Sequence, residues 1–399
     1  MHQRTPDDWR ALGGLDTAQE IAQQPAVWRA LAAGLCAGQA EIEAFLGDWL
    51  ARPEHLVILT GAGSSAYVGE IAADGLNAAW PAEVRAIAST SLLSHPELYL
   101  RPERPTLLVS FARSGNSPES LATVELLRSR LRAPCLFLNI SCNAEGSLVR
   151  HNAGRPDTLN LLMPAASCDR GFAMTSSFSS MLLAALAVLA APGSAWPDRL
   201  ARLEQLAVQG EQALQAWAPS LSSLGEQAFE RIVYLGSGPL EALAKEAALK
   251  VLELSSGRSL ALANTPLGFR HGPKSALNAA SLVVVFRSAG ALARSYEQDL
   301  LDELRRDGVA GRIVTVGPAD SASAGADDAW SLPAGALAEL AAQGDAWLAP
   351  LWLLMAQQFA LHQSARLGLT PDNPFPDGTV NRVVQGVTIH HSHHHHAEH

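Results

Sequence analysis

The amino-acid sequence predicts an α/β protein with two domains of the same kind, each a parallel β-sheet flanked by helices, and with helices at the N-terminus. Short apolar runs alternate with segments of helical periodicity, which is typical of successive βα units. This pattern occurs twice, because Gly61-Ala62-Gly63 ends one apolar run and Gly236-Ser237-Gly238 ends another, 175 residues later. With 399 residues, of which 48% are hydrophobic, the chain is long and apolar enough for two packed cores.

The apolar runs define the expected strands. Those of the first half are residues 56–59, 84–88, 106–111, 135–140 and 158–163. Those of the second half are residues 231–235, 282–286, 312–316 and a weaker run at 330–332. Helices are expected between them, for example over residues 118–131, 178–190, 240–254 and 346–367. The apolar helices at 178–190 and 346–367 match one another, which supports an internal duplication.

Four segments follow from this pattern. Residues 1–45 form an N-terminal helical segment that packs on the outside, and residues 46–215 form the first domain. Residues 216–372 form the second domain, and residues 373–399 are a C-terminal tail. A polar helical stretch at 204–223 is expected to connect the two halves.

Composition excludes several classes of function. The formal net charge of −10 argues against nucleic-acid binding, which normally needs a basic face. The longest apolar run, Met181 to Ala191, is far shorter than a membrane span, and no apolar stretch follows the first charges as in a signal peptide. The four cysteines lack metal-binding spacing. We therefore expect a cytoplasmic protein without a membrane, nucleic-acid or metal partner.

Two turns rich in glycine and serine follow strands of the first half. One spans residues 60–66, and the other spans residues 110–118 and leads into a helix. Backbone N–H groups at such a helix start, together with serine hydroxyls, suit a phosphate group. The corresponding turn of the second half, residues 287–290, has lost most of this chemistry, so we expect one phosphate site, in the first domain. The candidate binding residues are Gly63, Ser64, Ser65, Ser110, Arg113, Ser114, Asn116 and Ser117.

A dinucleotide site is the rival interpretation of the first turn. Such a site places a carboxylate at the end of the second strand, where it binds a ribose. Here residues 84–88 are followed by Ser89-Thr90-Ser91, with no carboxylate. We therefore expect no nicotinamide cofactor, and no other cofactor is indicated.

The helix expected at 240–254 carries a charged stripe on an apolar background. Glu246, Lys250 and Glu253 are spaced so that they share one face. An ordinary surface pair would explain Glu246 with Lys250 but not Glu253. Lys250 is also one of only three lysines in the chain, with Lys245 and Lys274, and arginine cannot replace a compact, titratable amine.

His271 lies in a loop between glycine and cationic residues, in the stretch 264–274. A loop histidine alone is weak support for catalysis. Combined with a carboxylate and an amine, it indicates proton transfer on a sugar phosphate.

These motifs carry a family resemblance. The two halves resemble sugar isomerase (SIS) domains, and most of the chain resembles the AgaS-type galactosamine-6-phosphate deaminase/isomerase family. The strings that carry the resemblance are residues 110–120, 171–178, 265–274 and 378–387. The resemblance implies a phosphorylated amino sugar as substrate and a homodimer, or a higher homo-oligomer, whose sites take residues from both subunits.

The isomerase half of glucosamine-6-phosphate synthase is a more distant resemblance and implies roles for single residues. By similarity to it, Ser114 and Ser117 bind phosphate and Glu253 moves a proton between C1 and C2 of the sugar. His271 of the partner subunit opens the ring, and Lys250 holds the oxygen or the base in place. Gln385 stands where the synthase has a tail lysine, so a protein Schiff base at that position is in doubt. We assign Gln385 and Glu246 to substrate binding.

Several functions remain open on the sequence. The leading one converts D-galactosamine 6-phosphate and water to D-tagatose 6-phosphate and ammonia, because no glutaminase half accompanies these residues. The alternatives are an aldose–ketose isomerase without deamination, a glucosamine-6-phosphate deaminase, and a sugar-phosphate sensor without catalysis. The histidine-rich end, residues 390–399, is interpreted as a tail and not as a metal site.

Overall fold

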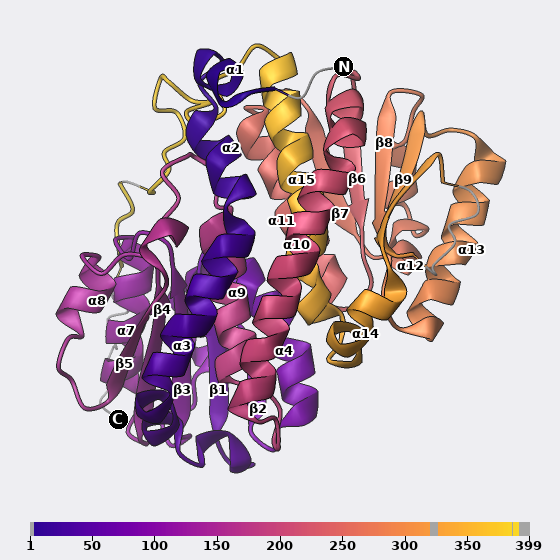
Figure 1. The fold of residues 1–399 in the computed structure, drawn as a ribbon. Coiled ribbons are helices and arrows are strands. Elements are labelled where there is room, and N and C mark those ends of the chain that lie inside the picture. Colours follow the sequence, from indigo (N-terminus) through magenta and orange to yellow (C-terminus); the bar gives the residue numbers. More distant parts are fainter. Residues whose placement is uncertain (1–3, 320–325, 385, 391–399) are drawn as a thin grey trace, which may run out of the picture.

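A computed structural model describes residues 4–319, 326–384 and 386–390, and it contains two five-stranded parallel sheets flanked by helices (Figure 1). The first sheet has the order β2-β1-β3-β4-β5 and the second the order β7-β6-β8-β9-β10. The strands are β1 (Leu56–Thr60), β2 (Glu83–Ala86), β3 (Thr106–Ala112), β4 (Cys135–Ser141) and β5 (Thr158–Leu162), then β6 (Arg231–Leu235), β7 (Leu260–Asn264), β8 (Ser281–Phe286), β9 (Arg312–Pro318) and β10 (Asp328–Leu332). The two sheets have the same topology, which confirms the predicted duplication.

Helices cover both faces of each sheet. The first half contains α4 (Ser64–Ala79), α5 (Ser89–Ser94), α6 (Pro96–Tyr99), α7 (Pro118–Arg130), α8 (Ser147–His151) and α9 (Ser176–Val188). The second half contains α11 (Pro239–Leu254), α12 (Pro266–Phe269), α13 (Ala291–Asp307), α14 (Ala334–Ala342) and α15 (Asp345–Arg366). Every residue of α9 is buried, and so are nearly all residues of α15, so these two matched helices lie inside the molecule.

The predicted connecting helix at 204–223 is the central part of a longer one. Helix α10 (Trp196–Gly225) continues through Pro219 and packs against α3 and α15. The N-terminal helices are α1 (Pro6–Ala11), α2 (Leu15–Ala22) and α3 (Gln24–Leu46). Helix α3 does more than cover the outside, because Trp28 is fully buried and belongs to the largest core cluster.

That largest cluster joins the two halves. It takes side chains from the inner faces of both sheets and from α4, α9, α11 and α15. Smaller clusters fill the outer faces, one under α5 to α8 and the other under α12 and α13. The inner helices are therefore held rigidly between the sheets, and this places the chemistry of α4 and α11 side by side.

Helices α4 and α11 hold equivalent positions in the two halves and pack against each other. Each starts after a glycine at φ +56°, Gly63 in one case and Gly238 in the other. Glu70 and Lys245 are the matched seventh residues of the two helices, 175 positions apart, and form an ion pair of 2.8 Å. The two halves thus meet at this pair as two copies meet at a two-fold axis.

One strand was not predicted. Strand β7 has the sequence Leu-Ala-Leu-Ala-Asn, without a β-branched residue, and it forms the edge of its sheet with Leu260 half exposed. In the described residues no helix is long and apolar enough to span a membrane.

Candidate active site

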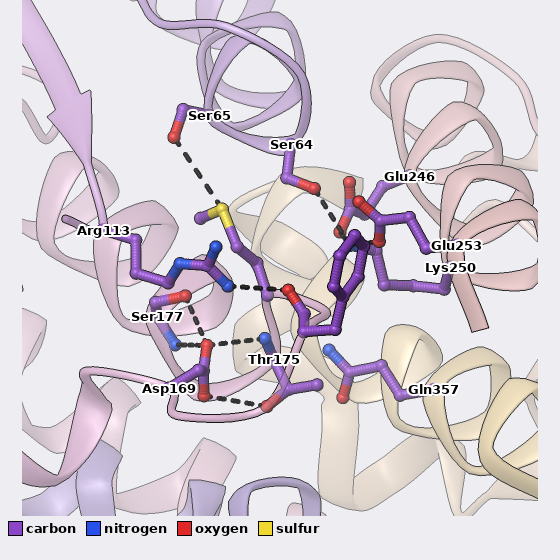
Figure 2. A network of polar contacts seen from close by, with 12 residues as sticks. Ser64, Ser65, Arg113, Asp169, Thr175, Ser177, Glu246, Lys250, Glu253 and Gln357 are labelled. Atoms are coloured by element: carbon purple, nitrogen blue, oxygen red, sulfur yellow. Dashed lines mark hydrogen bonds and ion pairs between the residues drawn. The ribbon is translucent and has the colours of Figure 1, made fainter. Parts of the chain in front are cut away.

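The charged stripe predicted on α11 is a buried cluster. Lys250 Nζ lies 2.6 Å from Glu253 Oε2 and 3.2 Å from Glu246 Oε1. The same amine donates to Ser64 Oγ at 3.0 Å, so it joins the second domain to the first (Figure 2). The side chains of Lys250 and Glu246 are fully buried, whereas 23% of the Glu253 side chain is exposed. Glu253 is therefore the carboxylate of this cluster that a substrate can reach.

Burial and charge act against each other in this cluster. Burial raises the pKa of Glu246 to about 7, although the neighbouring Lys250 charge acts to lower it. Burial alone would lower the pKa of Lys250, but the charges of Glu246 and Glu253 outweigh it, so that pKa is raised. Lys250 consequently stays protonated and fixes Glu253 beside it.

The turn before α4 is shaped by glycine. A Cβ on Gly61 would lie 2.6 Å from the backbone carbon of Ser65, so only glycine fits there. Gly63 takes its positive φ, and Ser64 then starts α4 with its hydroxyl directed at Lys250. Ser65 Oγ faces Met174 Sδ at 4.0 Å.

The turn between β3 and α7 keeps the features of an anion cradle. Ser110 is buried on β3. Ser117 Oγ shares a hydrogen bond of 2.7 Å with Ser120 Oγ, and Asn116 N–H donates to Ser114 Oγ at 3.3 Å. Within the described part of the chain, the N–H groups of Ser114, Gly115 and Ser117 have no acceptor.

Two of the predicted binding residues are engaged by the protein itself. Asn116 Oδ1 accepts hydrogen bonds from the N–H and the hydroxyl of Ser147, at 2.9 and 3.0 Å. The buried guanidinium of Arg113 donates to the carbonyl oxygens of Phe172 and Arg382, at 3.0 and 2.7 Å. Both side chains therefore hold the loops around the cradle in place.

Sequence reasoning missed Asp169. This buried carboxylate accepts hydrogen bonds from the N–H groups of Thr175, Ser176 and Ser177 and from the hydroxyls of Thr175 and Ser177. Asp169 thus caps the N-terminus of α9 (Figure 2). It also orders the loop before this helix, which carries Phe172. The run of hydroxyl residues before an apolar helix is the signal that could have found it.

The C-terminal segment returns to this loop. It runs from α15 across the first domain (Figure 1). There Phe375 packs against Phe172 with ring centroids 5.2 Å apart. Arg382 donates to the carbonyl oxygens of Asp169 and Arg170. Residues 387–390 line a groove of about 890 Å³ against α5, α6 and α7. Gln385 lies outside the described residues.

The structure does not bring His271 to the cluster of Glu246, Lys250 and Glu253. His271 is exposed on the turn after α12, where its backbone N–H donates to the carbonyl oxygen of Gly268 at 3.0 Å. Nearby, Lys274 pairs with Glu303 and Asp307. No group of His, Cys, Asp and Glu in the described residues could hold a metal ion.

Solved structures share this arrangement. A tagatose-6-phosphate ketose/aldose isomerase from Escherichia coli is 38% identical, with a TM-score of 0.84 over 94% of this chain and 96% of its own. The C-terminal domain of glucosamine-fructose-6-phosphate aminotransferase from Francisella tularensis has a TM-score of 0.72 at 19% identity, over 90% of this chain and 98% of its own, and shares the fold. The duplicated sheets and the site between them define the class, a double-SIS protein of the phosphosugar isomerase type.

Curated relatives give the family. A D-galactosamine-6-phosphate deaminase AgaS from Shewanella sp. is 40% identical over 94% of this chain and 92% of its own. Another, from Escherichia coli, is 41% identical over 95% of this chain and 97% of its own. The chain therefore belongs to the D-galactosamine-6-phosphate deaminase AgaS family. No protein-family model matches the chain.

Proposed function

We propose that this enzyme converts D-galactosamine 6-phosphate and water to D-tagatose 6-phosphate and ammonia. The observation that carries the proposal is the cluster on α11, in which the partly exposed Glu253 is held 2.6 Å from the buried Lys250. A single carboxylate beside a fixed ammonium group suits proton transfer between neighbouring carbons. The names of the family members supply the substrate and the direction of the reaction.

The proposed steps balance without a cofactor. Once the ring is open, Glu253 takes the proton from C2, the electron pair of the C2–H bond forms the C1=C2 double bond of an enolamine, and the aldehyde oxygen at C1 gains a proton. Glu253 then returns its proton to C1 on the same face while the C2 amine loses one proton. The substrate's own C2 amine becomes an imine, which water hydrolyses to the ketone and ammonia. No protein amine has to form a Schiff base, which agrees with Gln385 at the tail position.

The substrate's phosphate is assigned to the cradle of the first domain. The N–H groups of Ser114, Gly115 and Ser117 are available there, and the hydroxyls of Ser114 and Ser117 lie beside them. Ser64 of the same domain accepts a hydrogen bond from Lys250, so a sugar whose phosphate lies in the cradle would reach from the first domain to α11.

We assign ring opening to His271 of the partner subunit in a homodimer. Within one chain His271 makes no contact with the α11 cluster, while its exposure makes it available to a second copy. The free state of all four cysteines agrees with a cytoplasmic location.

The test is an assay of purified protein with galactosamine 6-phosphate and glucosamine 6-phosphate side by side. We expect ammonia and a ketose 6-phosphate in equal amounts, with the galacto substrate preferred. No ammonia from either amino sugar, together with interconversion of tagatose 6-phosphate and galactose 6-phosphate in a parallel assay, would instead establish the pure isomerase, the activity for which the E. coli structural relative is named. Preference for the gluco substrate would refute the substrate assignment alone.

A further inference from the structure

The turn after β8 has the same place in the second domain as the phosphate cradle in the first. Ala289 stands 175 residues after Ser114. The Ser114 N–H group has no acceptor within the described residues, whereas the Ala289 N–H donates to Asp345 Oδ1 at 2.7 Å. The backbone donors of the second turn are therefore already used by a carboxylate.

A second carboxylate completes this arrangement. Glu297 of α13 is fully buried, and its two oxygens lie 3.3 and 3.2 Å from the N–H of Ser288. Ser237, on the glycine turn after β6, donates its hydroxyl to Glu297 Oε1 at 3.0 Å. The hydroxyl of Ser288 donates to Asp345. The turns after the neighbouring strands β6 and β8 thus direct their hydrogen-bond donors at the same two carboxylates. This carboxyl-terminal edge of a parallel sheet is where ligands usually bind.

The buried guanidinium of Arg287 also lies beside one of these carboxylates. Arg287 is only 3% exposed, and its Nε lies 3.7 Å from Glu297 Oε2. Neither Nε nor Nη1 of this guanidinium has a hydrogen-bond partner among the described residues. A buried guanidinium with free donors is costly unless an anion faces it.

We infer that the second domain contains a phosphate-type oxyanion site that the side chains of Glu297 and Asp345 occupy from within. They present carboxylate oxygens to the backbone N–H groups, hydroxyls and guanidinium that would otherwise face the oxygens of a phosphate. A phosphate dianion is excluded by both their volume and their charge. The duplicated chain therefore binds one sugar phosphate and keeps its second domain closed.

The experiment measures binding of inorganic phosphate to E297A/D345A in the background S114A/S117A, which removes the two hydroxyls of the first cradle. Its backbone N–H groups remain, so any phosphate bound there is common to this variant and its control. The double substitution E297A/D345A takes away more non-hydrogen atoms than a phosphate ion adds. We expect phosphate at about ten times its dissociation constant to raise Tm by roughly 2 °C or more relative to chloride of equal ionic strength. Titration calorimetry should give one phosphate per chain.

The control is E54A/E339A in the same background, which removes two exposed carboxylates and so matches the charge change. It should show no phosphate-specific shift of Tm. Equal shifts in both variants, or none in either, would overturn the inference. If E297A/D345A does not fold, E297S/D345S takes its place, because each serine leaves a hydroxyl for the neighbouring donors while it removes the charge and most of the volume of the carboxylate. No phosphate-specific rise of its Tm would refute the site.

Discussion

At the scale of single residues, the chemistry depends on how the second domain holds Lys250. Its amine has three partners, Glu246, Glu253 and Ser64, and none of its surface is exposed. Removing one member of such a buried group leaves the others uncompensated, so their roles must be separated by nearly isosteric changes.

Glu253→Gln keeps the shape of the side chain and removes the carboxylate that we propose as the base. We expect kcat to fall by about 10²–10⁴-fold with little change in KM, because the phosphate cradle is untouched. Glu246→Gln is the matched control on the same helix and should lower kcat less, since Glu246 is fully buried and contacts Lys250. Steady-state kinetics with the phosphorylated amino sugar decides. If E253Q has near-normal turnover and His271→Asn is inactive, His271 and not Glu253 would be assigned as the base.

Glu20 couples the N-terminal helices to the loop behind the active site, and it makes stability depend on pH. Burial and the nearby charge of Asp169 raise its pKa to about 7, although N–H groups of Arg170 and Gly171 bond it. Between pH 4.5 and 7 the folded state then binds more protons than the unfolded state, so the free energy of unfolding falls as pH rises.

Glu20→Gln removes this titration. We expect the stability of E20Q relative to the wild type to increase from about pH 5 to about pH 8, measured by denaturant unfolding at each pH. Parallel pH profiles of the two proteins would show that Glu20 ionises in the folded protein as it does in the unfolded chain.

At the scale of elements, a glycine at the equivalent position of each half precedes equivalent helices, but the two helix starts serve different purposes. Gly63 and Gly238 both have φ +56°, and a Cβ would meet nothing within 4 Å at either position. The cost of alanine there is backbone strain alone, of roughly 1–3 kcal/mol. Only Gly63 precedes a serine that contacts Lys250; Gly238 precedes Pro239.

Gly63→Ala and Gly238→Ala should therefore lower the free energy of unfolding by similar amounts. Only G63A should also lower kcat, because it moves Ser64 away from the Lys250 amine. Unfolding curves and kinetics of both variants test this pair. An equal loss of kcat in both would show that the strain spreads through the packed α4 and α11.

Most elements could be predicted because apolar periodicity and glycine turns are local signals. The face shared by Glu246, Lys250 and Glu253 follows from helical spacing alone. Strand β7 escaped because an edge strand needs only one well-buried face, and alanine carries no strand signal. The roles of Asp169 and Arg113 escaped because their partners lie on a loop and a tail that only the tertiary fold brings together.

At the scale of the whole molecule, His271, to which we assign ring opening, lies apart from the α11 cluster of its own chain. His271 is exposed in the second domain and has no contact with the α11 cluster. If His271 acts across a dimer interface, each complete site combines Glu253 of one subunit with the partner's His271.

Mixed dimers of E253Q and H271N chains test this arrangement. Each parent dimer should be nearly inactive, whereas a mixed dimer contains one site with both native residues and one with neither. We expect about half of the wild-type activity per mixed dimer, measured after subunit exchange and separation by two different affinity tags. If His271 acts within its own chain, no site in the mixed dimer is complete and no activity returns.

The pair of Glu70 and Lys245 has a consequence for how such a molecule can evolve. In a dimer of two identical single domains, this position would face its own copy, so a glutamate would meet a glutamate and a lysine would meet a lysine. Joining two copies in one polypeptide removes that constraint, because each copy can then change alone. The opposite charges at matched positions, 2.8 Å apart, are a contact that two identical copies cannot make. The same freedom allows one half to keep a cradle for substrate while the other half fills its own.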